Sequence, residues 1–401
     1  MSNIEWTDAT WNPVVGCTPV SPGCLNCYAA TMARRLEAMG KAEYQPRDLE
    51  PHDFAYNGQF GRTDGIVRDA DGRLRVRIAE VRGGRAVFTG EVRTLPDRLA
   101  APLSWKKPRR VFVNSMSDLF HEAVPFEFID RVFAVMALCR RHTFQVLTKR
   151  PERMAEYLNG WAAYERVRTM IETPGNDVRV AWWKTLNTQQ RRQEQSQWWT
   201  NLPTDRWPLP NVWLGTSVEN QATADERLPY LVRCQAAVRF VSGEPLLGAV
   251  DLTRVNFGAP GVQNVLDCRV SEIAKRAGID KLNGVDWVIV GGESGPNARP
   301  CDVGHVRSVV QQCKAAGVPV FVKQLGVNVE WWSSTPDMKW PEGTRFRTDE
   351  SADFMRVRLR NRKGGDPAEW PDHLRVREMP GEQRDNAITR NSGTSEGPPR
   401  T

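Results

Sequence analysis

The sequence predicts an α/β fold: a complete or partial parallel βα barrel with insertions and a C-terminal extension. From residue 86 onward, short β-rich runs alternate with helical stretches. The runs are almost continuously apolar, as in parallel strands that are covered on both faces. At least seven strand candidates are present, which favours a barrel over a small open sheet. An open doubly wound sheet is the alternative.

Residues 1–40 are predicted to form a loop that bears cysteines and a first helix. Apolar residues recur there at alternating spacings of four and three, and Gly40 ends the pattern. The recurring residues are Leu25, Ala29, Met32, Leu36 and Met39. Residues 41–85 are polar and are interpreted as an insertion, in which DADG followed by RLRVRIAEV predicts a hairpin.

The barrel core is expected over residues 86–326, with helices at 126–140, 224–235 and 304–316. A second insertion, 155–210, interrupts it. The Gln- and Arg-rich run inside this insertion predicts a solvated helix face, and a nucleic-acid contact is the alternative. The strand candidates are AVFTGEV (86–92), RVFVNSM (110–116), FQVLTK (144–149), NVWLGTS (211–217), VRFVSGE (238–244), VDWVIVGGE (285–293) and VPVFVKQ (318–324).

The C-terminal part lacks the βα alternation. Residues 327–380 are interpreted as a mixed extension. Residues 381–401 have few apolar side chains to bury and are predicted to be disordered.

Composition indicates a globular protein and excludes several classes. Of 401 residues, 40% are hydrophobic and 26% charged, with a net charge of +7. No apolar run is long enough to span a bilayer, and no secretory signal is visible, so we expect a cytoplasmic location without membrane association. The basic charge is compatible with nucleic acid but mild for this length. The oligomeric state is left open.

Three of the eight cysteines lie within eleven residues, in the segment GCTPVSPGCLNCYA. In a reducing compartment, clustered cysteines are more often metal ligands than disulfides. Cys24 and Cys27 straddle a helix start, and the loop containing Pro19, Pro22 and Gly23 can return Cys17 to the same point. Thiolates select soft metals and iron–sulfur clusters.

Two kinds of metal site are compatible with this spacing. A closed zinc site needs four ligands, and no fourth Cys or His lies close in sequence, although His52 and His121 could be recruited through space. A four-iron cluster on three thiolates would instead keep one iron open for a chelating cofactor. A structural zinc site is therefore the alternative to an iron–sulfur cluster.

Six consecutive strand candidates end in polar groups, and parallel βα folds carry their active sites at these ends. Asp118 and Ser217 are predicted helix caps. Capping does not explain Lys149, Lys323, Glu244 and Glu293. The polar groups at the strand ends are Asn114, Ser115, Ser117, Asp118, Thr148, Lys149, Arg150, Thr216, Ser217, Glu219, Asn220, Ser242, Glu244, Glu293, Ser294, Lys323 and Gln324.

The segment GGESG at 291–295 is a further candidate. Gly291 and Gly292 would let a ligand approach the backbone closely, and Glu293 would accept hydrogen bonds from an ammonium group or ribose hydroxyls. His121 follows a strand end and is interpreted as an exposed loop histidine, with a functional role as the alternative.

The other cysteines are scattered along the chain. Cys139, Cys234 and Cys313 are predicted core residues. Cys301 could approach Glu293, and Cys268 is not placed.

The three cysteines near the N-terminus, the aromatic Tyr28 after the third, and the βα barrel behind them resemble the radical S-adenosylmethionine superfamily. The chain also resembles, over nearly its full length, an uncharacterised family of phage and prophage three-Cys-motif proteins. That resemblance rests on WTDATWNP, the cysteine segment, VFVNSMSDLFHE, LTKRPER, WLGTSVEN, SGEPLLG, GGESGPNARP, VKQLG and RKGGDPAEWPDHLRVRE.

The resemblance implies a barrel of the radical S-adenosylmethionine type, with a 4Fe-4S cluster on Cys17, Cys24 and Cys27 and S-adenosylmethionine as cofactor. The sequence departs from the superfamily in two respects. Six residues instead of the usual three separate the first two cysteines, and the Gly-Gly-Glu segment follows a late strand instead of an early one.

The predicted function is therefore reductive cleavage of S-adenosylmethionine, with electrons from a reductant protein and a nucleotide or nucleic acid as substrate. Lys149, Lys323 and Glu244 are the predicted catalytic residues. The predicted cofactor-binding residues are Asn114, Ser115, Ser117, Ser217, Glu219, Gly291, Gly292 and Glu293. A non-catalytic, zinc-stabilised nucleic-acid-binding accessory protein is the main alternative, and a zinc hydrolase is disfavoured because all-thiolate ligation is unusual at hydrolytic zinc.

Overall fold

The computed structural model describes residues 4–49, 65–68, 71–158, 160–173, 175–191, 207–259, 261–267, 284–295, 297–332, 337–348 and 353–381. Some expectations lie outside these ranges: His52, Cys268, most of the Gln- and Arg-rich run, and the predicted disordered tail beyond residue 381.

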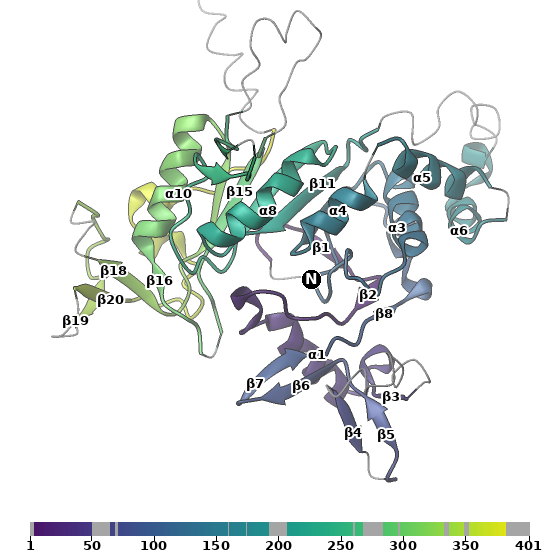
Figure 1. Ribbon diagram of the computed structural model, residues 1–401, viewed down its shortest axis with the longest axis horizontal. Coiled ribbons are helices and arrows are strands. Elements are labelled where there is room, and N and C mark those ends of the chain that lie inside the picture. The colour runs from purple at the N-terminus through teal and green to yellow at the C-terminus, as the bar shows by residue number, and fades with distance from the viewer. Residues whose placement is uncertain are drawn as a thin grey trace, which may run out of the picture.

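A curved sheet of seven parallel strands forms the centre of the protein (Figure 1). The strands follow one another in the sheet in chain order, which is the order of a parallel βα barrel. The predicted partial barrel is confirmed. In order, the strands are β1 (Ala9–Trp11), β9 (Arg110–Val113), β10 (Thr143–Thr148), β11 (Val212–Ser217), β12 (Val238–Gly243), β15 (Trp287–Gly291) and β17 (Val320–Gln324).

One strand of this sheet was assigned wrongly from the sequence. The first candidate, residues 86–92, belongs to an antiparallel hairpin of β6 (Ala79–Arg82) and β7 (Arg85–Phe88), outside the parallel sheet. Its apolar side chains pack under the first helix, with Phe88 in the same cluster as Ala29 and Ala33. The true first strand, β1, has three residues, too few to show a pattern.

Helices cover one face of the sheet, and the three predicted in the barrel core are present. The largest apolar cluster joins them to the sheet, because Val111, Val146 and Val288 pack together with helical residues such as Ile129 and Leu228. The helices after β9 are α3 (Phe126–Leu138), α4 (Pro151–Tyr157), α5 (Ala162–Glu172), α6 (Asp177–Thr185), α8 (Gln221–Arg233) and α10 (Val303–Ala316).

The other face of the sheet holds an aromatic cluster. Trp6 packs against Phe112 with ring centroids 4.9 Å apart, and Trp287 packs against Phe240 at 5.7 Å and Phe321 at 6.3 Å. Apart from Trp6, which precedes β1, these rings come from the first three residues of their strands. The amino-terminal half of this face is therefore apolar, and the polar residues follow at the carboxyl ends.

The N-terminal part forms a small subdomain beside the sheet (Figure 1). The predicted first helix is α1 (Tyr28–Ala38), and the predicted hairpin is β4 (Ile66–Arg68) paired with β5 (Leu74–Val76). Helix α1 buries Ala29, Ala30 and Ala33, whereas Met32 and Met39 of the apolar pattern are exposed. The subdomain also contains β2 (Val14–Val15), which pairs with β8 (Arg93–Thr94), and β3 (Arg47–Asp48), which pairs with β5.

The C-terminal extension adds a second sheet at the edge of the molecule (Figure 1). Its order is β16 (Cys301–Asp302), β18 (Val329–Trp332), β20 (Phe354–Arg358) and β19 (Arg345–Thr348). A short hairpin, β13 (Val255–Asn256) with β14 (Val262–Gln263), follows α8 and β12. Across the described ranges, no helix is both long and apolar enough to cross a membrane.

Candidate functional site

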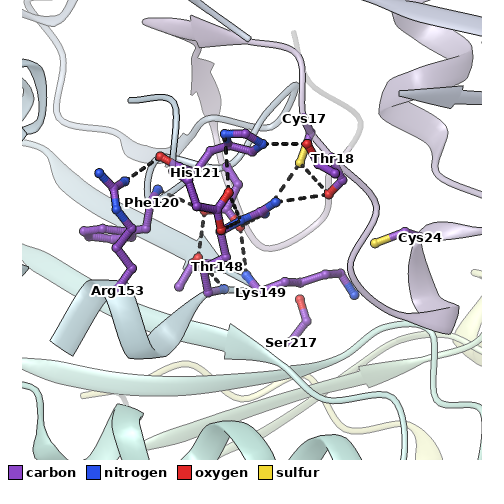
Figure 2. Close-up of polar contacts among 12 residues, drawn as sticks. Cys17, Thr18, Cys24, Phe120, His121, Thr148, Lys149, Arg153 and Ser217 are labelled. Atoms are coloured by element: carbon purple, nitrogen blue, oxygen red, sulfur yellow. Dashed lines mark hydrogen bonds and ion pairs between the residues drawn. The ribbon is translucent and has the colours of Figure 1, made fainter. Parts of the chain in front are cut away.

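The cysteine loop, residues 16–27, crosses the carboxyl ends of the parallel strands. At its start, the amide of Gly16 donates to the carbonyl of Met116, beyond β9 (3.2 Å). Farther along, the Ser21 hydroxyl donates to Glu219, beyond β11 (2.8 Å), and the Asn26 amide donates to Glu293, beyond β15 (2.8 Å). Figure 2 shows Cys17 and Cys24 facing the strand end that bears Lys149. The loop thus spans from one side of the sheet to the other.

Glu219 is the central anchor of this loop. Its side chain is fully buried and pairs with Lys149 through one carboxylate oxygen and with Arg227 through the other (3.0 Å). Burial alone would raise the pKa of this carboxyl, but Lys149 and Arg227 hold the pKa below its usual value. A Cβ on Gly23 would clash with the same carboxylate, so a larger residue here would require Glu219 or the loop to move.

Glu293 anchors the end of the loop in a similar way. It accepts hydrogen bonds from Asn26 and from the backbone amide of Arg299 (2.8 Å each), and the Arg299 guanidinium pairs with it. The same guanidinium donates to the carbonyl of Pro22 (2.7 Å). Burial raises the pKa of Glu293, but the Arg299 contacts outweigh burial and lower it.

Cys17 lies beside a buried ion pair. The Arg150 guanidinium is 3.8 Å from the Cys17 sulfur and 3.3 Å from Asp118, and it also donates to the carbonyl of Thr18 (3.2 Å). Burial, with the charge of Asp118, raises the pKa of the Cys17 thiol to about 12, although Arg150 opposes the shift.

His121 supports the same part of the loop. Its Nδ1 accepts from the amide of Ala123 (3.1 Å), so in the neutral ring the proton is on Nε2, which donates to the Thr18 hydroxyl (2.8 Å). Burial, with the charge of Arg150, lowers the pKa of His121 to about 4. The interpretation as an exposed loop histidine is wrong, because the ring is 5% exposed and packs under the loop.

Cys24 and Cys27 lie near the start of α1. The Cys24 sulfur is 3.8 Å from the Ser21 hydroxyl. Burial raises the pKa of Cys27, but the amides of Ala30 and Ala29 hydrogen bond to its sulfur and oppose that shift. The thiols are close enough that charge on Cys24 raises the pKa of Cys27, and charge on Cys27 raises that of Cys17.

The three thiols suit a soft metal in their chemistry, but their side chains do not converge. Within the described part of the chain, no three His, Cys, Asp or Glu side chains form a ready ligand group for a metal ion. The loop therefore carries three neighbouring thiol donors at the carboxyl ends of the sheet.

Glu244 and Lys323 form the charged pair at the strand ends that does not bind the loop. The Lys323 ammonium is 2.9 Å from the Glu244 carboxylate, and both side chains keep some exposure to solvent. The Ser242 hydroxyl also contacts Glu244 (3.4 Å). This pair is therefore partly accessible to a ligand, as is Lys149.

Several predicted cofactor-binding residues already have partners within the chain. Asn114 accepts from the amide of Val14 (3.3 Å), and Ser117 donates to the carbonyl of Val14 (2.9 Å). Ser115 donates to Asn12 (3.1 Å). Ser217 lies near Lys149, at the end of β11 (Figure 2). Their role in cofactor binding stays a prediction.

The two glycines of the GGESG segment are explained by packing between strands. A Cβ on Gly291 would lie 2.6 Å from the carbonyl oxygen of Gln324, and one on Gly292 would lie 2.3 Å from that of Leu325. The backbone that approaches these glycines therefore belongs to β17 and the residue after it. A ligand role for Gly291 and Gly292 stays a prediction.

The two helix caps were assigned wrongly from the sequence. Helix α8 is capped by Asn220, which forms a capping box with Thr223, and not by Ser217. Asp118 accepts from the amide of Phe120 and the hydroxyl of Thr148 (3.0 and 2.7 Å) and caps no helix. Both assignments failed because the helices begin a few residues later than the strand ends suggest.

Sequence reasoning missed the residues that hold the loop in place, namely Ser21, Asn26, Arg227 and Arg299. Ser21 and Asn26 lie inside the cysteine segment, so a search for polar residues between the cysteines would have found them. Arg227 and Arg299 gave no local signal, because their partners lie elsewhere in the chain or depend on the loop's path.

The remaining described cysteines are core residues. Cys139, Cys234 and Cys313 are buried, as predicted. Cys301 is buried as well, and its Cβ lies 2.8 Å from the position a Cβ on Gly292 would take. It is near the Glu293 segment but faces the interior.

Comparison with curated proteins and with solved structures returned no match. The described architecture, with its cysteine loop over the strand ends, lies almost entirely within residues 1–366. These residues match the family described as protein of unknown function (DUF5131), and the chain belongs to that family.

Proposed function

We propose that this protein is an iron–sulfur enzyme of the radical S-adenosylmethionine kind, which reductively cleaves that cofactor and acts on a nucleotide or DNA. One observation supports the proposal most. The loop that bears the three cysteines is seated over the carboxyl ends of a parallel βα sheet, where folds of this architecture carry their active sites.

The residues around the loop suit thiolate ligands. Arg150 and Lys149 place positive charge beside Cys17 and Cys27, and the amides at the start of α1 favour a thiolate at Cys27. A 4Fe-4S cluster on Cys17, Cys24 and Cys27 would supply electron transfer and an open iron for the cofactor. The electron itself requires a reductant protein.

The accessible charges at the strand ends suit the rest of the cofactor or substrate. Glu244 would bind an ammonium group, and Lys323 would bind a carboxylate or phosphate. Glu219 and Glu293 are already paired with loop residues, so we propose that they position the cluster instead of contacting the cofactor directly.

Anaerobic reconstitution with iron and sulfide tests the proposal. We expect about four irons per chain, binding of S-adenosylmethionine, and slow release of 5'-deoxyadenosine by the reduced protein. Cys24→Ala should abolish the cluster and the cleavage. Cys234→Ala, which changes a core cysteine outside the loop, should retain both.

Glu244→Gln tests the cofactor site separately. It should leave the iron content unchanged and weaken cofactor binding by about ten- to a hundredfold, as expected for loss of one charge-assisted contact. Reconstituted protein that holds the cluster but neither binds nor cleaves S-adenosylmethionine would contradict the proposed reaction.

A structural zinc site is the second candidate, and one observation favours it. Glu219 and Glu293 are fully engaged in tying the loop to the sheet, as expected of a loop with a structural role. Stoichiometric zinc without iron in anaerobically prepared protein would support this candidate and exclude the enzyme.

A further inference from the structure

The C-terminal sheet presents four arginines on one face. In the pairing of β19 with β20, Arg345 lies opposite Arg358 and Arg347 lies opposite Arg356. Residues directly opposite in an antiparallel pair share a face, as do alternate residues along a strand. All four arginines are exposed. We call this set, Arg345, Arg347, Arg356 and Arg358, the arginine face.

No carboxylate of the described residues forms an ion pair with any of the four arginines, and the Arg356 guanidinium lies over the Phe354 ring, 5.9 Å from its centroid. Glu330 faces Arg356 from β18 and interacts with its charge, although burial outweighs this interaction and raises the pKa of the carboxyl. Like charges directly opposite one another weaken a sheet, so the arrangement needs a reason outside folding stability.

Two aromatic rings lie on the same face, next to the arginines. Trp332 of β18 is opposite Phe354 of β20, and their ring centroids are 4.9 Å apart at an interplanar angle of 37°. The Trp332 indole hydrogen bonds to Glu330, which fixes the orientation of the ring. Both rings are partly exposed.

The opposite face of the sheet is partly apolar and buried. It buries Val329 and Val357, which join the main apolar cluster. The arginine face is therefore the outward side of a sheet whose inner side holds it to the barrel, and Figure 1 shows β18, β19 and β20 at the periphery of the molecule.

We propose that the arginine face, with Trp332 and Phe354, binds single-stranded nucleic acid. Guanidinium groups pair with phosphates through two parallel hydrogen bonds, and aromatic rings on an open sheet stack on unpaired bases. An acidic peptide would use the charge but would not stack on the rings, and binding to vesicles of anionic lipid distinguishes a membrane. The net charge of +7 adds a general attraction for a polyanion.

This inference goes beyond the proposed function and does not depend on it, because it concerns a surface apart from the cysteine loop. Binding of nucleic acid is measured without iron, reductant or S-adenosylmethionine. Failure of the binding test and failure of the cleavage test are therefore distinguishable.

The experiment measures fluorescence anisotropy of a labelled oligothymidylate of about 20 nucleotides, longer than the site of most single-strand modules, with the full-length protein over a range of salt concentrations. The test variant replaces Arg345, Arg347, Arg356 and Arg358 with Gln. The control variant replaces Lys41, Lys106, Lys107 and Lys184, which are exposed elsewhere, with Gln and has the same net charge.

We expect the arginine variant to bind at least about tenfold more weakly than the control, and the slope of log affinity against log salt to fall by about 3, since each phosphate contact on a single strand contributes about 0.7. Its unfolding midpoint should stay equal or rise, because like-charge pairs are removed. Trp332→Leu should weaken binding about fivefold or more through lost stacking.

Equal affinities for the arginine and control variants would overturn the proposal. Binding to vesicles of anionic lipid without binding to the oligonucleotide would also overturn it, as would equal affinity for duplex and single strand. If Trp332→Leu fails to fold, the arginine variants and the comparison of duplex with single strand still decide the outcome.

Discussion

At the scale of single residues, buried charges in this protein serve to place the cysteine loop. Glu219 is fully buried and is shared by Lys149, Arg227 and Ser21. These partners come from three separate parts of the chain, so one carboxylate joins β10, α8 and the loop. A buried charge with partners on several sides is costly to leave unpaired, which makes Glu219 a sensitive position.

Glu219→Ala should therefore lower the free energy of unfolding by about 3–5 kcal/mol, because Arg227 would be left buried without its carboxylate. Urea unfolding measures this change. Glu172→Gln, which breaks the more exposed pair with Arg168, is the control and should cost less than about 1 kcal/mol. Similar, small losses in both variants would contradict a central role for Glu219.

His121 gives the loop a dependence on pH. Burial lowers its pKa from 6.5 to about 4, so between these values the unfolded chain binds a proton that the folded chain does not. The free energy of unfolding is therefore unaffected by this titration above pH 6.5, and it falls as the pH drops from 6.5 toward 4. The full shift corresponds to about 3 kcal/mol.

His121→Gln should flatten this pH dependence in metal-free protein. The measurement is the free energy of unfolding at several pH values between about 4 and 8 for both proteins, and their difference isolates the histidine. If wild type and variant lose stability in parallel as the pH falls, the titration belongs to other groups.

At the scale of elements, the position of the cysteine loop depends more on its contacts with residues at the strand ends than on its own sequence. The sequence predicted the loop, the helix after it and the strand ends below it, because cysteine spacing and apolar runs are local signals. It did not predict that Glu219 and Glu293 would anchor the loop, since those contacts join residues roughly 200 or more positions apart in the chain.

Gly23→Ala tests how closely the loop fits the strand ends. The new Cβ would meet the carboxylate of Glu219, which its partners hold in place, so we expect a loss of about 1–3 kcal/mol and faster proteolysis within residues 16–27. Gly295→Ala, with no atom within 4 Å of the new Cβ, is the matched control. Equal stability of the two variants would mean that the loop can shift away from Glu219.

At the scale of the whole molecule, alternating strands and helices were enough to predict a partial parallel barrel. The prediction missed β1, because this strand has only three residues. It also assigned to the barrel a run that belongs to an antiparallel hairpin of the N-terminal subdomain. The arginine face was missed for another reason. RFRT and FMRVR alternate with a period of two, but only their pairing shows that the arginines of both strands lie on one face.

Because the loop ties the N-terminal subdomain to strands on both sides of the sheet, metal at its thiols should stabilise the entire chain. A metal that binds only the folded state adds about 2.7 kcal/mol at a hundredfold excess over its dissociation constant, so loading should raise the unfolding midpoint and chelation should reverse it. Thermal unfolding with and without reconstituted metal measures the effect.

Cys24→Ala should remove this metal-dependent gain, whereas Cys234→Ala, in the core, should lower stability equally with and without metal. A metal-dependent gain that survives Cys24→Ala would show that the metal binds elsewhere in the chain, and the cysteine loop would then be held by its carboxylate anchors alone.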